Sequence, residues 1–146
     1  VEEVSVPQGV PVEWALNATV KAPFRVMVGV QKPRTRGERL VISMIVKVAD
    51  QHRAILMAMQ DRERAKAMSD LLQRLVYVCP ECVVIFQPAL ESPDTIVVTR
   101  ILYDDEIGPS ALGKSLRILV NEYAVIVSYF NSQLGSSAQT TTMVHM

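Results

Sequence analysis

The sequence predicts an α+β domain in which a mainly antiparallel, five-stranded sheet packs against two long helices. Short stretches with alternating polar and apolar side chains, or with a continuous apolar run, indicate the strands. Two longer stretches, 50–77 and 109–134, have the composition or the spacing of helices. The elements follow the order β-β-β-α-β-β-α, with strands in blocks and helices between them, which favours antiparallel pairing.

The composition is that of one globular domain. The chain has 146 residues, of which 49% are hydrophobic and 21% are charged, enough to form a hydrophobic core. We expect the domain to span residues 1–134 and the small, polar segment 135–146 to be a frayed tail. No apolar run has transmembrane length and no signal peptide is visible, so we expect a cytoplasmic protein without a membrane partner. The formal net charge of zero gives no argument for a nucleic-acid partner.

The first part of the chain carries three predicted strands. Residues 1–10 are expected to form an irregular lead-in, because they include proline and glycine. Apolar and polar side chains alternate over Pro11–Val20 and again over Phe24–Gln31, as they do in strands with one buried face. Arg39–Val48 contains an almost continuous apolar run, which predicts a central strand buried on both faces.

The longest candidate helix, Asp50–Tyr77, contains no glycine and no proline. Its apolar residues recur in steps of three and four, which places them on one face. Four consecutive charged residues, Asp61–Arg64, interrupt this stripe. An alternative is therefore a strand over Arg53–Gln60, followed by a shorter helix from Asp61. A single helix would be roughly 40 Å long, which suggests a bend or a partner.

Two further strands and a second helix complete the predicted domain. The strands are Glu81–Gln87 and Thr95–Tyr103, and the loop between them holds two prolines. Pro109 suits the first turn of the following helix. That helix is expected to end at Leu134, because Gly135 suits its C-terminal cap.

The last predicted helix is apolar around nearly its whole circumference. Such a helix has to be buried on all sides, whereas one sheet covers only one side. Either a second copy of the chain or the long helix of the same subunit covers the rest, and the sequence leaves both open. For a homodimer, the predicted interface residues are Leu116, Leu119, Tyr123, Ile126, Val127 and Phe130.

The element order and hydrophobic spacing over Trp14–Val48, Ser69–Leu72 and Thr95–Tyr129 resemble the type III secretion chaperone-like family, including its YbjN-type bacterial members. The short helix that usually precedes the first strand in this family has no counterpart here. The resemblance implies a secretion-chaperone-like α+β fold and a dimeric, non-enzymatic protein that binds an extended segment of another protein. It brings no catalytic residues to this chain.

One segment matches the phosphate-binding P-loop pattern G-x-x-x-x-G-K-[ST]. Gly108, Gly113, Lys114 and Ser115 occupy its defined positions, and such a loop cradles phosphates with backbone N–H groups while the Lys and Ser contact phosphate and Mg²⁺. The acidic Asp104–Glu106 would repel a phosphate, and no later strand can supply an aspartate for Mg²⁺. A nucleotide-binding protein or NTPase is therefore the second hypothesis, and we expect no binding of ATP or GTP.

Cys79 and Cys82 form a C-x-x-C pair, whose spacing suits half of a zinc site or a redox pair. The pair follows a predicted helix rather than opening one, so no helix N-terminus lowers the thiol pKa. His52 and His145 are poorly placed by sequence to complete a metal site. Two ordinary turn cysteines or a local disulfide remain the simpler interpretation, and we expect no cofactor.

Basic residues gather at the connection between the second and third strands: Lys32, Arg34, Arg36 and Arg39. Nucleic-acid binding is therefore a third hypothesis. No aromatic side chain is interleaved to stack on bases, so a solvated hairpin tip is the preferred interpretation. The acidic Asp104–Glu106 could bind a divalent cation, but these residues more simply favour the positive start of the following helix.

The leading hypothesis is a non-enzymatic protein-binding domain, chaperone-like or regulatory, that acts as a homodimer. Its expected partners are a second copy of the chain and a segment of another protein, with nucleic acid disfavoured. No combination of residues in the sequence indicates a catalytic site, because neither histidine has a suitable Ser, Cys or carboxylate beside it in the sequence.

Overall fold

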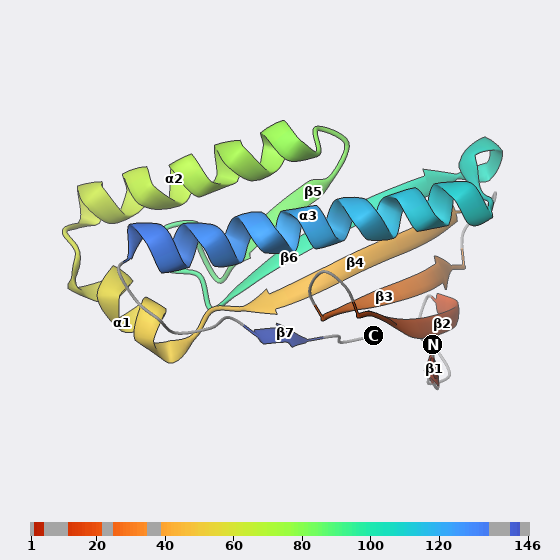
Figure 1. The fold of residues 1–146 in the computed structure, drawn as a ribbon, viewed down its shortest axis with the longest axis horizontal. Coiled ribbons are helices and arrows are strands. Elements are labelled where there is room, and N and C mark those ends of the chain that lie inside the picture. Colours follow the sequence, from red (N-terminus) through yellow and green to blue (C-terminus); the bar gives the residue numbers. More distant parts are fainter. Residues whose placement is uncertain (1, 5–11, 22–24, 35–38, 135–140, 144–146) are drawn as a thin grey trace.

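A computed structural model describes residues 2–4, 12–21, 25–34, 39–134 and 141–143. The described chain forms two layers, an antiparallel sheet and a layer of helices against one of its faces (Figure 1). The strands are β1 (Glu2–Val4), β2 (Val12–Val20), β3 (Val26–Pro33), β4 (Arg39–Lys47), β5 (Val83–Gln87), β6 (Thr95–Tyr103) and β7 (Thr141–Met143). The helices are α1 (Asp50–Ala58), α2 (Asp61–Val78) and α3 (Pro109–Gln133), with the short 3-10 helix η1 (Asp104–Glu106) before α3.

The strands lie in the order β1-β2-β3-β4-β6-β5, and β7 pairs with the end of β4, next to the start of β3. All pairings are antiparallel, which confirms the predicted α+β class and its mainly antiparallel sheet. The sheet has more than the five predicted strands. β1 lies in the segment predicted to be an irregular lead-in, and β7 lies in the predicted polar tail. Three-residue strands are too short to produce a detectable periodicity.

The prediction of a single helix over residues 50–77 is wrong, and so is the alternative of a strand over 53–60. α1 ends at Ala58, and α2 begins at Asp61, where the alternative placed its start. Met59 and Gln60 between them have extended backbone, with ψ values of 154° and 149°.

The break between α1 and α2 is held by one side chain. The Arg64 guanidinium donates to the carbonyl oxygens of Leu56 and Met59, at 3.4 Å each, and pairs with Asp61 at 2.6 Å. Two carbonyls at the end of α1 therefore have a hydrogen-bond donor outside the helix. These contacts join residues up to eight positions apart, and for that reason no helical periodicity reveals them.

The core lies between the helices and the covered face of the sheet. α3 packs over β3, β4 and β6, and α2 packs against α3 and β5. On β4, Ile42, Met44 and Val46 are fully buried, whereas Val41 and Ile45 on the opposite face are only half-buried. The prediction that this strand is buried on both faces is therefore wrong, although its central position is confirmed.

The circumference of α3 is covered largely within the subunit. Leu119, Ile126 and Phe130 are fully buried in the core, so their predicted role as interface residues is wrong. The Tyr129 hydroxyl donates to the Ala67 carbonyl oxygen at 2.7 Å and ties α3 to α2. The three other predicted interface residues, Leu116, Tyr123 and Val127, are half-buried.

Candidate functional site

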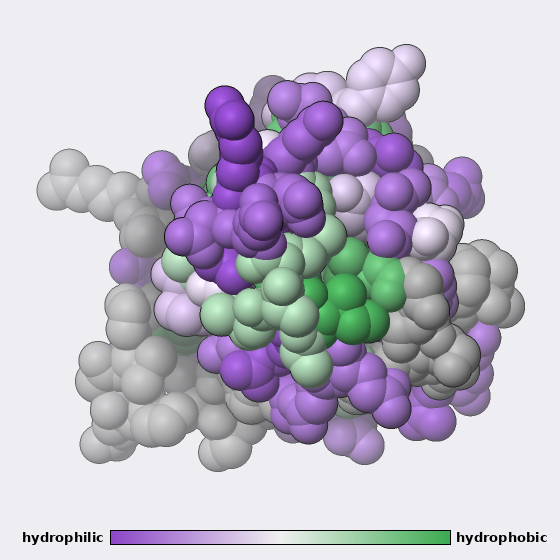
Figure 2. Space-filling view, turned by 90° about the vertical axis from the view of Figure 1, so that its left-hand side faces the viewer, coloured by the Kyte–Doolittle hydropathy of each residue, from purple (hydrophilic) through white to green (hydrophobic). Residues whose placement is uncertain are grey.

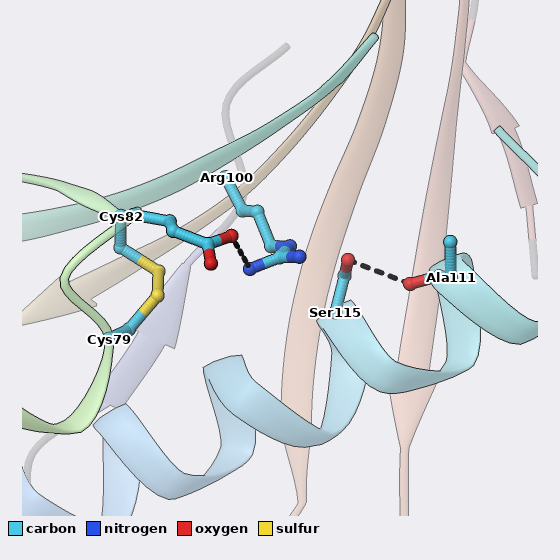
Figure 3. The surroundings of a disulfide bond; sticks show 6 residues. Cys79, Cys82, Arg100, Ala111 and Ser115 are labelled. Atoms are coloured by element: carbon cyan, nitrogen blue, oxygen red, sulfur yellow. Dashed lines mark hydrogen bonds and ion pairs between the residues drawn. A yellow bond between two sulfur atoms is a disulfide. The ribbon is translucent and has the colours of Figure 1, made fainter. Parts of the chain in front are cut away.

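The turn between α2 and β5 contains the C-x-x-C pair, and the structure joins Cys79 to Cys82 by a disulfide (Figure 3). The Cys82 N–H donates to the Cys79 carbonyl oxygen at 3.1 Å and closes the turn. The cysteines are only 3% and 9% exposed, whereas Pro80 and Glu81 between them face solvent. The backbone of the turn is thus at the surface, while its sulfur atoms point into the protein.

A buried cation anchors this turn to the sheet. The Arg100 guanidinium, whose side chain is 10% exposed, reaches from β6 and pairs with the Glu81 carboxylate at 2.9 Å. Figure 3 shows Arg100 beside the disulfide turn. Arg100 lies on the covered face of β6, between the buried Val98 and Leu102 at every second position. A charge in that position is costly unless it is paired, so the ion pair fixes where the turn lies.

A carboxyl group from α3 completes the cluster. Glu122 is fully buried, and its oxygens accept no hydrogen bond from any residue that the structure describes. One of these oxygens and the two sulfur atoms of Cys79 and Cys82 lie within 4.8 Å of one another. Burial raises the pKa of Glu122 to about 8, because an apolar environment disfavours the charged form. The carboxyl group is therefore mostly neutral at pH 7.

Glu122 was not among the candidate site residues predicted from the sequence, although its spacing along the helix indicates that it is buried. It follows Leu119 by three positions and precedes Ile126 by four, and this spacing places it on the same helix face as both. Both of these neighbours are fully buried. A single acidic residue within the apolar stripe of a helix thus indicates a buried carboxyl group.

The disulfide changes what Cys79 and Cys82 can do. As a disulfide, the sulfurs are not thiolates, and thiolates are what zinc requires. Reduction would give two thiols with Glu122 as a third donor, short of the four ligands of a structural zinc site among the described residues. A disulfide that closes so short a loop adds only about 2 kcal/mol to stability. His52 is buried in α1, where its ring stacks on Phe130. It is not part of the cluster formed by Cys79, Cys82 and Glu122.

The P-loop-like segment does not form a phosphate-binding loop. α3 begins at Pro109, and the Leu112 N–H donates to the Gly108 carbonyl oxygen at 3.0 Å. The Ser115 hydroxyl is buried and donates to the Ala111 carbonyl oxygen at 2.8 Å (Figure 3). Lys114 is exposed on the helix surface. Residues 109–115 therefore form the first two turns of a helix, not a loop that wraps around a phosphate.

Two of the four basic residues predicted to cluster, Lys32 and Arg39, contact neighbouring side chains. Lys32 pairs with Glu13 at 3.0 Å, and the Arg39 guanidinium lies 5.5 Å from the centre of the Tyr103 ring. Arg34 is exposed, and Arg36 lies outside the described residues. Two aromatic residues lie beside members of this cluster, Tyr103 at Arg39 and Trp14, the cross-strand partner of Lys32.

The acidic residues Asp104–Glu106 form η1, immediately before α3, and all three are exposed. The Glu106 carboxylate accepts a hydrogen bond from the Tyr103 N–H at 3.4 Å. This contact caps the short helix. Among the described residues, the group of side chains close enough together to hold a metal ion is Cys79, Cys82 and Glu122, and it includes none of these three carboxylates.

The exposed large hydrophobic residues concentrate near the disulfide turn. Seven described residues of this kind are at least 39% exposed, and five of them fall within residues 76–85. They are Val76, Tyr77 and Val78 at the end of α2, and Val83 and Ile85 on β5. The remaining two are Met57 and Tyr103. A concentration of this kind marks an interaction surface more often than single exposed residues do.

Another hydrophobic patch lies at the end of the molecule that carries α1, where hydrophilic residues border it (Figure 2). On this helix, Ala54, Met57 and Ala58 are exposed. Met57, at 58%, is the single large exposed hydrophobic side chain of α1. It offers a comparison site for the surface around residues 76–85.

No helix among the described residues is long and apolar enough to cross a membrane.

No curated protein matches the chain. Among solved structures, an uncharacterized protein from Methanothermobacter thermautotrophicus is similar, with a TM-score of 0.79 and 13% sequence identity. The match covers 92% of this chain and 89% of that one, and at this identity it shows a shared fold. Neither of these comparisons, nor the family match, names a secretion chaperone. Residues 1–130 match the model of a family described as "Uncharacterized conserved protein (DUF2299)", and the chain therefore belongs to this family.

Proposed function

We propose that this protein is a non-enzymatic protein-binding domain that acts as a homodimer, and that its subunits join through β5. The observation that carries the proposal is the concentration of exposed large hydrophobic side chains over residues 76–85. Within this stretch, the exposed Val83 and Ile85 of β5 alternate with Val84 and Phe86, which pack toward the core, so they lie on the open face of the sheet. The predicted interface on α3 is replaced by this surface, because much of α3 is covered within the subunit.

β5 has the properties of an edge strand that is paired in the assembled protein. It is the last strand of the sheet and pairs only with β6 among the described strands. Its sequence, Val-Val-Ile-Phe-Gln, contains no charged residue and no proline. Natural proteins usually protect an open edge with charges, prolines or bulges. An unprotected, apolar edge therefore favours a partner strand.

A second copy of the chain fits this edge. Two β5 strands related by a two-fold axis would pair antiparallel and make the two sheets continuous. With the axis at Ile85, each Ile85 faces its counterpart, and each Val83 faces Gln87 of the other copy. β5 itself carries no charged residue, so its pairing with a second β5 places no like charges opposite each other.

A chaperone-like or regulatory role in the cytoplasm, with an extended segment of another protein as ligand, belongs to the same proposal. It is supported by the order of the elements alone. A nucleotide-binding role is not proposed, because the residues of its motif lie in a regular helix.

The test is sedimentation equilibrium at micromolar concentration on three proteins: the wild type, Ile85→Lys and Met57→Lys. We expect the wild type and Met57→Lys to be dimers with twice the subunit mass of 16.2 kDa. Ile85→Lys should be a monomer, because two lysines would face each other across the axis. Both substituted side chains are about half exposed, so both variants should fold. A wild-type monomer, or an Ile85→Lys dimer, would contradict the proposal.

A further inference from the structure

We propose that Cys79 and Cys82 are a redox-active pair, reduced by an external dithiol, and that the Glu122 carboxyl group exchanges a proton with the reacting sulfur. The pair lies next to the proposed dimer contact, since Cys82 directly precedes β5, but both cysteines belong to the core between the sheet and the helices. The proposal rests on three features: the disulfide, a buried carboxyl group beside it, and a turn that is anchored without it.

The first feature is the arrangement of the three side chains. One Glu122 oxygen and both sulfurs lie within 4.8 Å of one another, and all three residues are buried. A short movement of a side chain brings a carboxyl oxygen to hydrogen-bond distance from a thiol. The cluster joins residues that are about 40 positions apart in the sequence, so local chain geometry does not explain it.

The second feature is the lack of a structural role for the Glu122 carboxyl group. Its two oxygens accept no hydrogen bond from the described residues. A buried polar group without a partner destabilises the folded protein, and an apolar side chain of similar size would pack there without that cost. A carboxyl group in this place is explained if its proton is used. Burial raises its pKa to about 8, so it carries a proton to donate at neutral pH.

The third feature is the way in which the turn is held. The Glu81–Arg100 ion pair and the hydrogen bond from the Cys79 N–H to the Leu75 carbonyl oxygen fix the turn on both sides. Neither contact involves a sulfur atom, so reduction leaves the position of the turn intact.

The reaction that follows is an ordinary thiol–disulfide exchange. A thiolate of the external dithiol forms a bond with the Cys82 sulfur, the more exposed residue of the pair. The bond between the protein sulfurs breaks, and the Cys79 sulfur leaves with the electron pair and accepts the proton of Glu122. The Glu122 carboxylate then takes the proton of the second thiol of the dithiol as that thiol attacks the dithiol sulfur now bonded to Cys82. A bond forms between the two dithiol sulfurs, and the bond to Cys82 breaks. The Cys82 sulfur leaves and is protonated by solvent.

Electrons and protons balance over these steps. The dithiol loses two electrons and two protons and becomes a disulfide. The protein disulfide gains both and becomes two thiols, and Glu122 ends in its starting form. The co-reactant is a dithiol, and no metal takes part.

The test uses the folded, oxidised full chain with excess dithiothreitol at neutral pH. Samples are quenched with a maleimide, and the mass increase counts the free thiols. The chain has only two cysteines, so every thiol detected comes from this disulfide. The wild type is compared with Glu122→Gln and with Ser115→Ala. The second variant removes another buried polar group from α3, two turns earlier on the helix.

We expect Glu122→Gln to slow reduction by about tenfold or more, the scale of general acid–base catalysis. Ser115→Ala should react at the wild-type rate. If Glu122→Gln does not fold, Glu122→Asp keeps the carboxyl group but withdraws it from the sulfurs, and it should also be slow. Equal rates in wild type and Glu122→Gln would overturn the proposal, as would a wild-type disulfide that dithiothreitol does not reduce in the folded protein. Stoichiometric, Glu122-dependent binding of zinc to the reduced protein that blocks reoxidation would overturn it as well.

Discussion

The two outer edges of the sheet differ in where they place charge. At the β1 edge, Glu2 and Glu3 are exposed on a strand of three residues. At the β5 edge the exposed side chains are apolar and the ionisable ones are buried. Val83 and Ile85 face solvent, whereas Arg100 and Glu122 are buried nearby in the fold. Exposed apolar and buried ionisable groups both destabilise an isolated domain. A protein that keeps both on one side is best explained by a function located there.

The β1 edge shows what ordinary protection looks like in the same sheet. Charged side chains on a very short strand discourage pairing with another chain. β5 is longer and carries neither charge nor proline. The contrast directs the predictions below to the β5 side, where substitutions should have the larger consequences.

The largest effect is expected from Glu122→Gln on the pH dependence of stability. With a pKa of about 8 in the folded oxidised protein and 4.5 as the ordinary value, Glu122 binds a proton when folded and loses it when unfolded between these two pH values. The stability of the wild type should therefore fall as pH rises from 4.5 to 8, by on the order of 4 kcal/mol. Glu122→Gln should lack this fall.

Urea unfolding of both proteins at pH 5 and pH 8 measures the effect. The exposed Glu106→Gln is the matched control, and its stability should follow the wild type at both pH values. A constant difference between Glu122→Gln and the wild type would show that the Glu122 carboxyl group does not remain protonated in the fold.

A smaller effect is expected from the two ion pairs that flank the sheet. Glu81 pairs with Arg100 on the β5 side, and Glu13 pairs with Lys32 on the β1 side, at 2.9 and 3.0 Å. Glu81→Ala leaves a buried guanidinium unpaired and should lower the unfolding free energy by roughly 2–3 kcal/mol. Glu13→Ala removes one contact of Lys32, whose side chain is 25% exposed, and should cost less than about 1 kcal/mol.

Urea unfolding at pH 7 compares the two variants directly. Equal losses for Glu81→Ala and Glu13→Ala would mean that Arg100 is solvated when its partner is removed, and the proposed anchoring of the disulfide turn would fail.

The regular parts of the fold followed from the sequence. β6 occupies the predicted Thr95–Tyr103, and α3 differs from its predicted range by one residue at its end. In both, local periodicity or helix-start and helix-end residues determine the element. The predicted helix over Asp50–Tyr77 failed for the opposite reason. Its break depends on Arg64, which contacts carbonyl oxygens five and eight residues away.

The candidate site was predicted only in part. Cys79 and Cys82 are neighbours in sequence, and their spacing indicated either a pair or a local disulfide. Glu122 and Arg100 reach the same turn from α3 and β6, and such long-range proximity depends on how the helices cross the sheet. The surface over residues 76–85 was missed because apolar residues in a helix and a strand predict burial unless the position of the element in the sheet is known.

The central claim, that β5 pairs with a second copy, is tested most directly by amide hydrogen exchange measured by mass spectrometry at two protein concentrations. Backbone N–H groups on the outer side of β5 become protected only when a partner strand accepts their hydrogen bonds. We predict that exchange over residues 83–87 slows as the concentration rises from below to above the dissociation constant, while exchange over residues 2–4 does not change. Exchange over residues 83–87 that is independent of concentration, and as fast as that of residues 2–4, would contradict the account.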